Sequence, residues 1–156
     1  MSNRSEDILD LALDAGEIIL VSGGEIYRVE NTIERIGIAY GAQRVDAFAT
    51  PTGILTTVVD SQGNCCTRVR RIHKVENDLT RLERTNDLSR RIARGQVPMC
   101  AAIAELGEIK ELPKPPRSLK FLASGFIGSS FAYIFKGGLP EVIVAFFVGL
   151  LVFLII

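Results

Sequence analysis

The chain has 156 residues, of which 18 are basic and 18 are acidic, so its formal net charge is zero. This balance argues against nucleic acid as the main partner, because phosphate binding requires a surplus of Lys and Arg. The charges are unevenly spread, since residues 117–156 carry only Arg117, Lys120, Lys136 and Glu141. We therefore expect a charged soluble segment followed by an apolar one.

The first part of the chain shows the periodicity of a helix. Apolar residues recur every three or four positions between Ile8 and Ile19, and Ser22-Gly23-Gly24 is expected to end that helix. A second helix is predicted over residues 25–40, with Gly41 at its C-terminal cap. The chain therefore starts with a helical pair.

The pattern then changes to extended chain. Residues 44–50, 54–60 and 65–72 are rich in Val, Ile, Thr and Phe, which is typical of strands. The turns between them are short, at residues 50–53 and 61–64, so the strands are expected to form an antiparallel meander. Because a bare three-stranded sheet is only marginally stable, we expect the flanking helices to cover one face.

Helical periodicity returns over residues 76–94 and 98–110. The predicted fold class is therefore α+β, with two helices, a three-stranded antiparallel meander and two more helices, followed by transmembrane helices. A Pro-rich linker at residues 113–118 would separate a cytoplasmic α+β domain (1–112) from a transmembrane region (119–156).

Two uncharged runs in the last part of the chain, residues 121–135 and 142–156, predict two membrane helices. The second run has no polar end, which indicates a truncated span. Basic residues between Lys110 and Lys120 precede the first run, so the N-terminal domain is expected in the cytoplasm.

Several blocks of sequence, in order, carry a resemblance to a known family. They are Gly24–Thr32, Tyr40-Gly41, Thr50–Ile54, Thr67–Ile72, Asp78-Leu79, Asn86–Arg90 and Phe131–Gly138 followed by Glu141. In this order they resemble the N-terminal domain and first membrane turn of the threonine/serine exporter (ThrE-like) family, which includes a succinate-exporter branch. The resemblance covers nearly the whole chain from Ile8 onward.

The resemblance implies a multi-pass inner-membrane exporter of small amino acids (threonine/serine) or related carboxylates, coupled to the proton gradient, with this chain as its N-terminal part. Its partners would be the small-molecule substrate, the lipid bilayer and, in some members, a second small membrane subunit. The chain would then not be an enzyme. Two alternatives stay open, namely a membrane-tethered hydrolase-like enzyme domain and an assembly subunit of a split exporter.

Polar residues on the second helix and on the strands form a candidate substrate site. They are Glu25, Arg28, Glu30, Thr32, Thr50, Thr52 and Arg70. In this hypothesis Arg28 binds a carboxylate through two parallel hydrogen bonds, and Glu25 or Glu30 binds an amine.

Each of these residues also has a structural interpretation. Glu25 and Arg28 are spaced as a helix-surface pair, and turn chemistry accounts for Thr50 and Thr52. Arg70 shares a strand face with Arg68, and both arginines would need acidic partners if they were buried. The candidate partners are Asp46, Asp60 and Asp78.

Glu141 is the only acidic residue of the apolar region. It follows Pro140, so it either complements the dipole at a helix start or lines a proton or substrate pathway. His73 is the only histidine and no Cys-x-x-Cys is present, so neither a metal site nor a cofactor is expected. The hydrolase alternative would need a nucleophile near His73, and Thr67 or Cys66 could serve by position, although neither lies in a nucleophile motif.

Overall fold

The structure is a computed structural model that describes residues 4–113 and 116–155. The chain divides into two compact units, Met1–Leu112 and Pro113–Ile156. The linker predicted at residues 113–118 lies partly outside the described residues, because residues 114–115 are not among them. Each unit is described here by itself.

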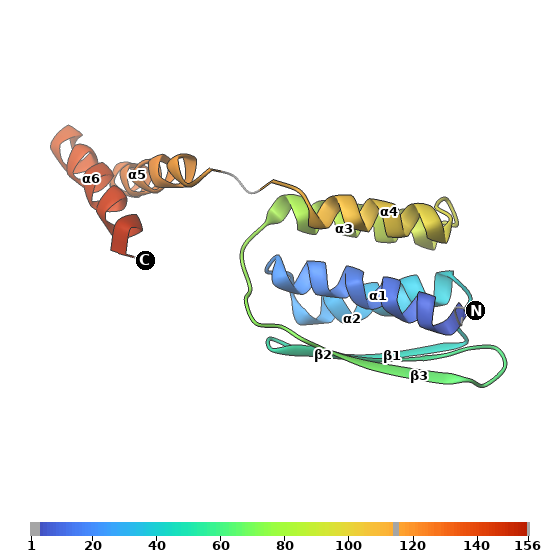
Figure 1. Cartoon of the computed structure of the whole chain (residues 1–156). Coiled ribbons are helices and arrows are strands. Elements are labelled where there is room, and N and C mark those ends of the chain that lie inside the picture. The colour runs from blue at the N-terminus through green and yellow to red at the C-terminus, as the bar shows by residue number, and fades with distance from the viewer. Residues whose placement is uncertain (1–3, 114–115, 156) are drawn as a thin grey trace. The chain divides into compact units, whose positions relative to one another are not determined.

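The first unit is built from three layers (Figure 1). Its elements are α1 (Arg4–Val21), α2 (Ile26–Ala39), β1 (Arg44–Thr50), β2 (Gly53–Val59), β3 (Cys65–Arg71), α3 (Leu79–Ala93) and α4 (Met99–Lys110). The α1–α2 pair lies between the sheet and the α3–α4 pair. The predicted α+β order of helices and strands is confirmed, and the first two helices provide the expected cover for the sheet.

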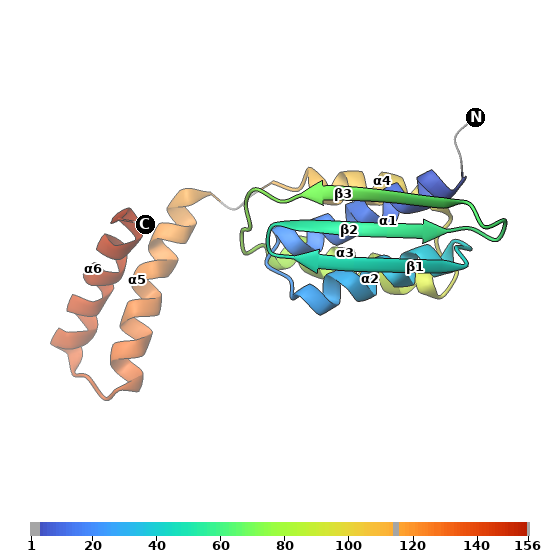
Figure 2. The ribbon, with the colours of Figure 1, turned by 90° about the horizontal axis from the view of Figure 1, so that it is seen from below.

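The sheet is an antiparallel meander in the order β1-β2-β3. Side chains alternate between its faces, so Ile54 and its β3 partner Arg70 lie on the face that is covered by helices. The other face is open (Figure 2). On it, Phe48, Leu55 and Val69 are paired across the strands and are all exposed.

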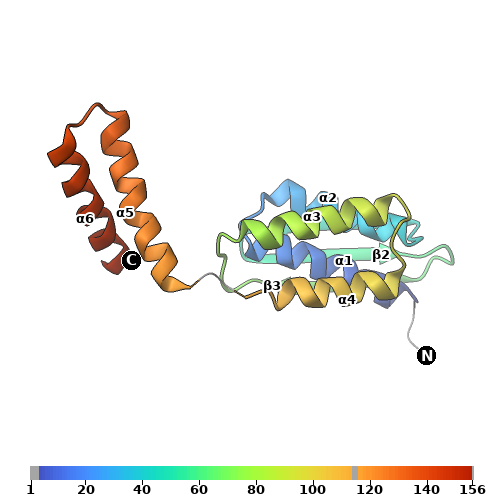
Figure 3. The same ribbon diagram turned by 90° about the horizontal axis from the view of Figure 1, so that it is seen from above.

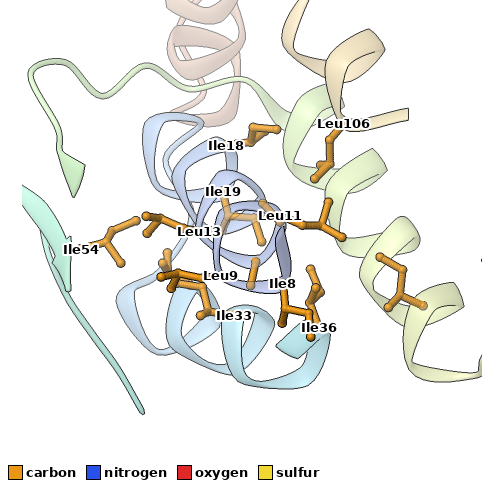
Figure 4. Packing of buried hydrophobic residues seen from close by; sticks show 14 of the residues in the cluster. Ile8, Leu9, Leu11, Leu13, Ile18, Ile19, Ile33, Ile36, Ile54 and Leu106 are labelled. Carbon is orange, nitrogen blue, oxygen red and sulfur yellow. The ribbon is translucent and has the colours of Figure 1, made fainter. Parts of the chain in front are cut away.

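The core is centred on α1, which contacts α2, α3, α4, β2 and β3. Figure 4 shows Leu13 of α1 pointing towards Ile54 of the sheet and Leu9 of α1 beside Ile33 of α2, with Leu106 of α4 on the other side of α1. Gly16 allows α2 to approach closely, since a Cβ there would lie 2.5 Å from Ile33 Cδ1. A helix surrounded in this way must be apolar on most of its circumference, which is what the α1 sequence provides.

Local signals end the helices where the sequence predicts. α1 stops at Val21, and Gly23 adopts a left-handed φ of 83°, which a residue with a Cβ rarely does. The side chain of Asp78 caps α3 by accepting a hydrogen bond from the backbone N of Arg81 at 3.1 Å. The three cysteines, Cys65, Cys66 and Cys100, are free.

The second unit is a helical hairpin of α5 (Arg117–Ile134) and α6 (Leu139–Ile155). Small residues allow the two backbones to approach closely, since a Cβ on Gly128 would lie 2.5 Å from the carbonyl oxygen of Ala145. Apart from Gly125 at this contact, no described residue of either helix is buried. The surface of the hairpin is therefore largely apolar.

None of the described helices combines the length and the apolar character that crossing a membrane requires. The two transmembrane helices predicted for residues 119–156 are therefore not confirmed. Ile156, the last residue of the second predicted span, lies outside the described residues.

Candidate functional site

A charged pocket lies in the first unit where α1 ends and α3 begins. These two segments are joined by backbone hydrogen bonds, from Glu76 N to Val21 O at 2.7 Å and from Asp78 N to Ser22 O at 3.2 Å. The C-terminal end of α4 lies beside the start of α3 (Figure 3). The pocket has a volume of about 320 Å³, and the residues that line it are Glu17, Ile18, Val21, Arg70, Arg81 and Lys110. We call it the exit pocket, because the chain leaves the first unit just after Lys110.

Glu17, the acidic residue that lines the exit pocket, belongs to an acidic stripe on α1. Asp10, Asp14 and Glu17 are spaced by four and three residues, so they form one polar stripe on an otherwise apolar helix. Arg68 and Arg70 alternate on β3 and therefore face the same way, towards this stripe. Arg68 pairs with Asp10, and Arg70 pairs with both Glu17 and Asp14, the latter at 3.1 Å.

The acidic partners predicted for the strand arginines are wrong. Asp46 pairs with Arg44 on the open face of the sheet, at 2.9 Å. Asp60 accepts hydrogen bonds in the β2–β3 turn, and Asp78 pairs with Arg81. The reason is geometric: both strand arginines project towards the covered face, where α1 supplies the carboxylates.

Arg81 provides the second guanidinium of the pocket, from the first turn of α3. Its Nη2 donates a hydrogen bond to the carbonyl oxygen of Leu112 at 2.7 Å. Its Nε is buried without a hydrogen-bond partner among the described residues, although Asp78 Oδ2 lies 3.3 Å away. The side chain is only 18% exposed, so this guanidinium is incompletely satisfied in a mostly desolvated position.

Lys110, in the last turn of α4, is the third cation that lines the pocket. Its Nζ donates to Asp14 Oδ2 at 2.8 Å, so Asp14 joins the ammonium group of α4 to the guanidinium of Arg70 on β3. Three cations and one carboxylate thus line the exit pocket, beside apolar wall from Ile18 and Val21. Such a lining can bind a small molecule that carries a carboxylate.

Of the seven substrate residues predicted from the sequence, Arg70 is the one that lines this pocket. Glu25 and Arg28 form an exposed pair at 3.2 Å at the start of α2. Hydrogen bonds with Tyr27 and with Arg28 hold the pKa of Glu25 below its usual range. Glu25 and Arg28 therefore pair with each other, and neither lines the pocket that contains Arg70.

The remaining predicted residues lie in two further places. Glu30 Oε1 accepts a hydrogen bond from the backbone N of Ala49 at 2.9 Å, and Thr32 is buried in α2. Thr50 and Thr52 lie together in the β1–β2 turn, with 3.4 Å between their hydroxyl oxygens. The contacts of the seven predicted substrate residues therefore lie in separate parts of the first unit and do not form one shared site.

Glu141 lies in the second unit, in the first turn of α6 and exposed. Its carboxylate folds back towards the helix start, since a Cβ on Gly138 would lie 2.8 Å from Glu141 Oε2. This position suits the interaction of an acid with the positive end of a helix dipole.

Among the described residues, the structure does not show the contact between His73 and a nucleophile that the hydrolase alternative requires. His73 is exposed after β3, and no recorded hydrogen bond joins it to Thr67 or Cys66. The Thr67 hydroxyl instead lies 2.8 Å from the hydroxyl of Thr57.

Three charged residues of the exit pocket were not predicted as site residues: Glu17, Arg81 and Lys110. The available signal was the acidic stripe on α1, because a regular row of carboxylates on a mostly apolar helix needs cations on the elements packed against it. Arg81 has no comparable signal in the sequence, since its role depends on where the backbone of Leu112 passes.

Comparison with known proteins agrees with the resemblance noted in the sequence. Residues 10–156 match the model of a protein family, ThrE, described as "Putative threonine/serine exporter". No curated protein and no solved structure matches the chain. Since the match extends over both structural units, the chain belongs to the ThrE family of threonine/serine exporters.

Proposed function

We propose that this chain is the N-terminal part of a proton-coupled exporter of small amino acids, threonine and serine, or of related carboxylates. The observation that carries the proposal is the family match over residues 10–156, which includes both the α+β unit and the helical hairpin. The α+β unit is then the cytoplasmic domain, and the hairpin belongs to the inner-membrane part.

The surface of the hairpin supports this location. Large apolar side chains are exposed along both helices, from Leu119 on α5 to Ile155 on α6. A soluble protein rarely exposes so continuous an apolar surface, whereas lipid or further membrane helices would cover it. Close backbone contact at Gly128 and Gly149 is also typical of helices that pack within a bilayer.

Glu141 is the residue we assign to the transport pathway. It is the only acidic residue among residues 117–155, and carboxylates in apolar membrane regions are costly unless they have a function. Glu141→Gln keeps the size of the side chain but removes both the proton that a carboxylic acid can carry and the negative charge at the start of α6. Lost export with an unchanged melting temperature would support a proton-linked role, whereas a lower melting temperature would indicate the structural role at the helix start.

Efflux measurements test the proposal. Cells that lack the gene would be complemented with the complete gene product, loaded with labelled threonine, serine or succinate, and followed for loss of label. We expect faster efflux of at least one of these compounds than in cells without the protein, and loss of that difference when a protonophore collapses the proton gradient. Equal efflux of all three compounds with and without the protein would contradict the proposal.

A further inference from the structure

We propose that the exit pocket is a binding site for a small zwitterionic amino acid, separate from the transport pathway. The pocket is lined entirely by residues of the first unit, from α1, β3, α3 and α4. The inference goes beyond the proposed function, and the binding of a ligand here can be measured whether or not the protein exports anything.

The cations of the pocket favour a carboxylate. Arg70 uses only Nη1 in its ion pairs with Asp14 and Glu17, and its second terminal nitrogen has no recorded partner within the described chain. Arg81 likewise uses Nη2 for Leu112 O, and its Nε is buried beside Asp78 Oδ2, so its Nη1 is the nitrogen with no recorded partner among the described residues. The second terminal nitrogens of the two arginines can bind carboxylate oxygens without breaking the contacts already present, and guanidinium groups suit carboxylates in particular.

Glu17 adds a second requirement to the ligand. Its carboxylate lines the same pocket as the three cations and is about three-quarters buried. A dicarboxylate would place a second negative charge beside it, which is unfavourable, whereas an ammonium group would gain an ion pair. A ligand with one carboxylate and one ammonium group therefore matches the lining better than a purely anionic one.

The apolar wall and the volume limit the size of the side chain. Ile18 and Val21 are the apolar residues of the lining, so a short aliphatic or methyl-bearing side chain can pack there. A volume of about 320 Å³ is at the low end of the roughly 300–1,000 Å³ found for small-molecule sites. The pocket therefore suits an amino acid of threonine size and not a nucleotide.

The existing ion pairs do not close the site. The side chains of Arg70 and Asp14 are 32% and 33% exposed, and pairs at such positions are weakly held because water competes for the same groups. The ligand can therefore share Arg70 with α1 at low cost.

Calorimetric titration of the full-length protein in detergent tests the site with three probes: L-threonine, 3-hydroxybutyrate, which lacks the ammonium group, and threoninol, which lacks the carboxylate. We expect threonine to bind at least about tenfold more tightly than either analogue, since each analogue loses one charge-assisted contact. Succinate is the fourth probe. Succinate binding tighter than threonine, or no binding of threonine, would overturn the proposal.

Two substitutions link binding to the pocket. Glu17→Gln should remove the preference for threonine over 3-hydroxybutyrate, and Arg81→Gln should remove the preference for threonine over threoninol. The matched controls are Glu83→Gln and Arg84→Gln, which make the same changes at exposed positions of α3 outside the pocket lining. Threonine binding that is unchanged in both pocket variants would place the ligand elsewhere and overturn the proposal.

Two further measurements make the result interpretable. Lys110→Gln provides a third pocket variant should Arg81→Gln melt before binding can be measured, and it should weaken threonine binding by about tenfold. Export measured in the same variants distinguishes the two proposals. Export that persists in pocket variants that have lost threonine binding supports a site separate from the transport pathway, whereas a wild type that exports but binds no threonine at this pocket overturns the binding site alone. Binding to the wild type that is lost in the pocket variants supports the site even where no export is found.

Discussion

The carboxylate of Glu30 on α2 accepts a hydrogen bond from the backbone N of Ala49 on β1, at 2.9 Å, across 19 residues of sequence. Because β1 is an edge strand, this amide has no neighbouring strand on that side to accept its proton. The contact therefore fastens the second helix to the edge of the sheet. It gives Glu30 a structural role that is compatible with the amine-binding role proposed from the sequence but does not require it.

Glu30→Ala should reduce the free energy of unfolding by about 1–3 kcal/mol, because the Ala49 amide loses its acceptor in a partly buried position. Glu30→Gln keeps an acceptor oxygen and should cost less than half as much. Denaturant unfolding would measure both variants. Glu34→Ala, at an exposed position one turn further along α2, is the control, and an equal loss in that variant would show that the Ala49 contact contributes nothing.

Arg28→Lys should leave both the melting temperature and the export rate unchanged. The pair with Glu25 is exposed, its ionic attraction is screened by water, and lysine can maintain it. Melting curves and efflux would be measured in the same preparation. Normal melting with lost export would instead support a carboxylate-binding role for Arg28, since only a bidentate contact distinguishes the two side chains.

Two glycine substitutions in helices should have opposite effects. Gly16→Ala places a Cβ 2.5 Å from Ile33 Cδ1 in the core and should destabilise the protein by about 1–3 kcal/mol. Gly107→Ala on α4 meets no atom within 4 Å and should stabilise it by about 0.5–1 kcal/mol through better helix propensity. Thermal unfolding measures both variants, and a Gly16→Ala variant that is as stable as the wild type would contradict the packing of α1 against α2.

Asp14 and Arg70 should be energetically coupled. A double-mutant cycle with Asp14→Asn and Arg70→Gln is expected to give a coupling energy of about 1 kcal/mol, because the pair is only partly exposed. The coupling should decrease in high salt, which screens partly exposed charges. A coupling energy of zero at low salt would mean that the Arg70–Glu17 and Asp14–Lys110 contacts stabilise the protein equally well without the Asp14–Arg70 pair.

Asp60 should make the stability depend on pH. Hydrogen bonds from Asn64, Ser5 and Gln62 lower its pKa from 3.8 to about 2. Since the folded-state pKa lies below the unfolded one, this contribution is complete above about pH 4 and is lost as the pH falls towards 2. The melting temperature of the wild type should therefore fall more steeply over this range than that of Asp60→Asn. Parallel curves would contradict the low pKa.

The order of helices and strands in the first unit could be predicted because its signals are local. Periodicity, the Gly23-Gly24 stop and the Pro-Gly turn at residues 51–53 each act within a few residues, and the structure confirms the elements they predict. The stacking of α3 and α4 on α1 could not be read in this way. The stacking depends on which faces of several amphipathic helices pack together, and this pairing cannot be predicted from the sequence of one helix alone.

Only the part of the candidate site that follows from side-chain alternation along a strand could be predicted from the sequence. Alternation placed Arg68 and Arg70 together, but their partners came from a helix more than 50 residues away and not from the acids nearer in sequence. The membrane region was predicted from its lack of charge. The structure has helices there, α5 and α6, but neither meets the combined requirement of length and apolarity for a span.

The hydrogen bond from Arg81 to the carbonyl oxygen of Leu112 has a mechanical consequence. Leu112 is the last residue of the first unit, and its carbonyl belongs to the backbone, so the attachment does not depend on the side chain at that position. A pull on Leu112 is carried by the covalent backbone into α4 and, through this bond and Arg81, also into the first turn of α3. Because α3 packs on α1, α2 and α4, the end of the unit is anchored to its helical layers at two points.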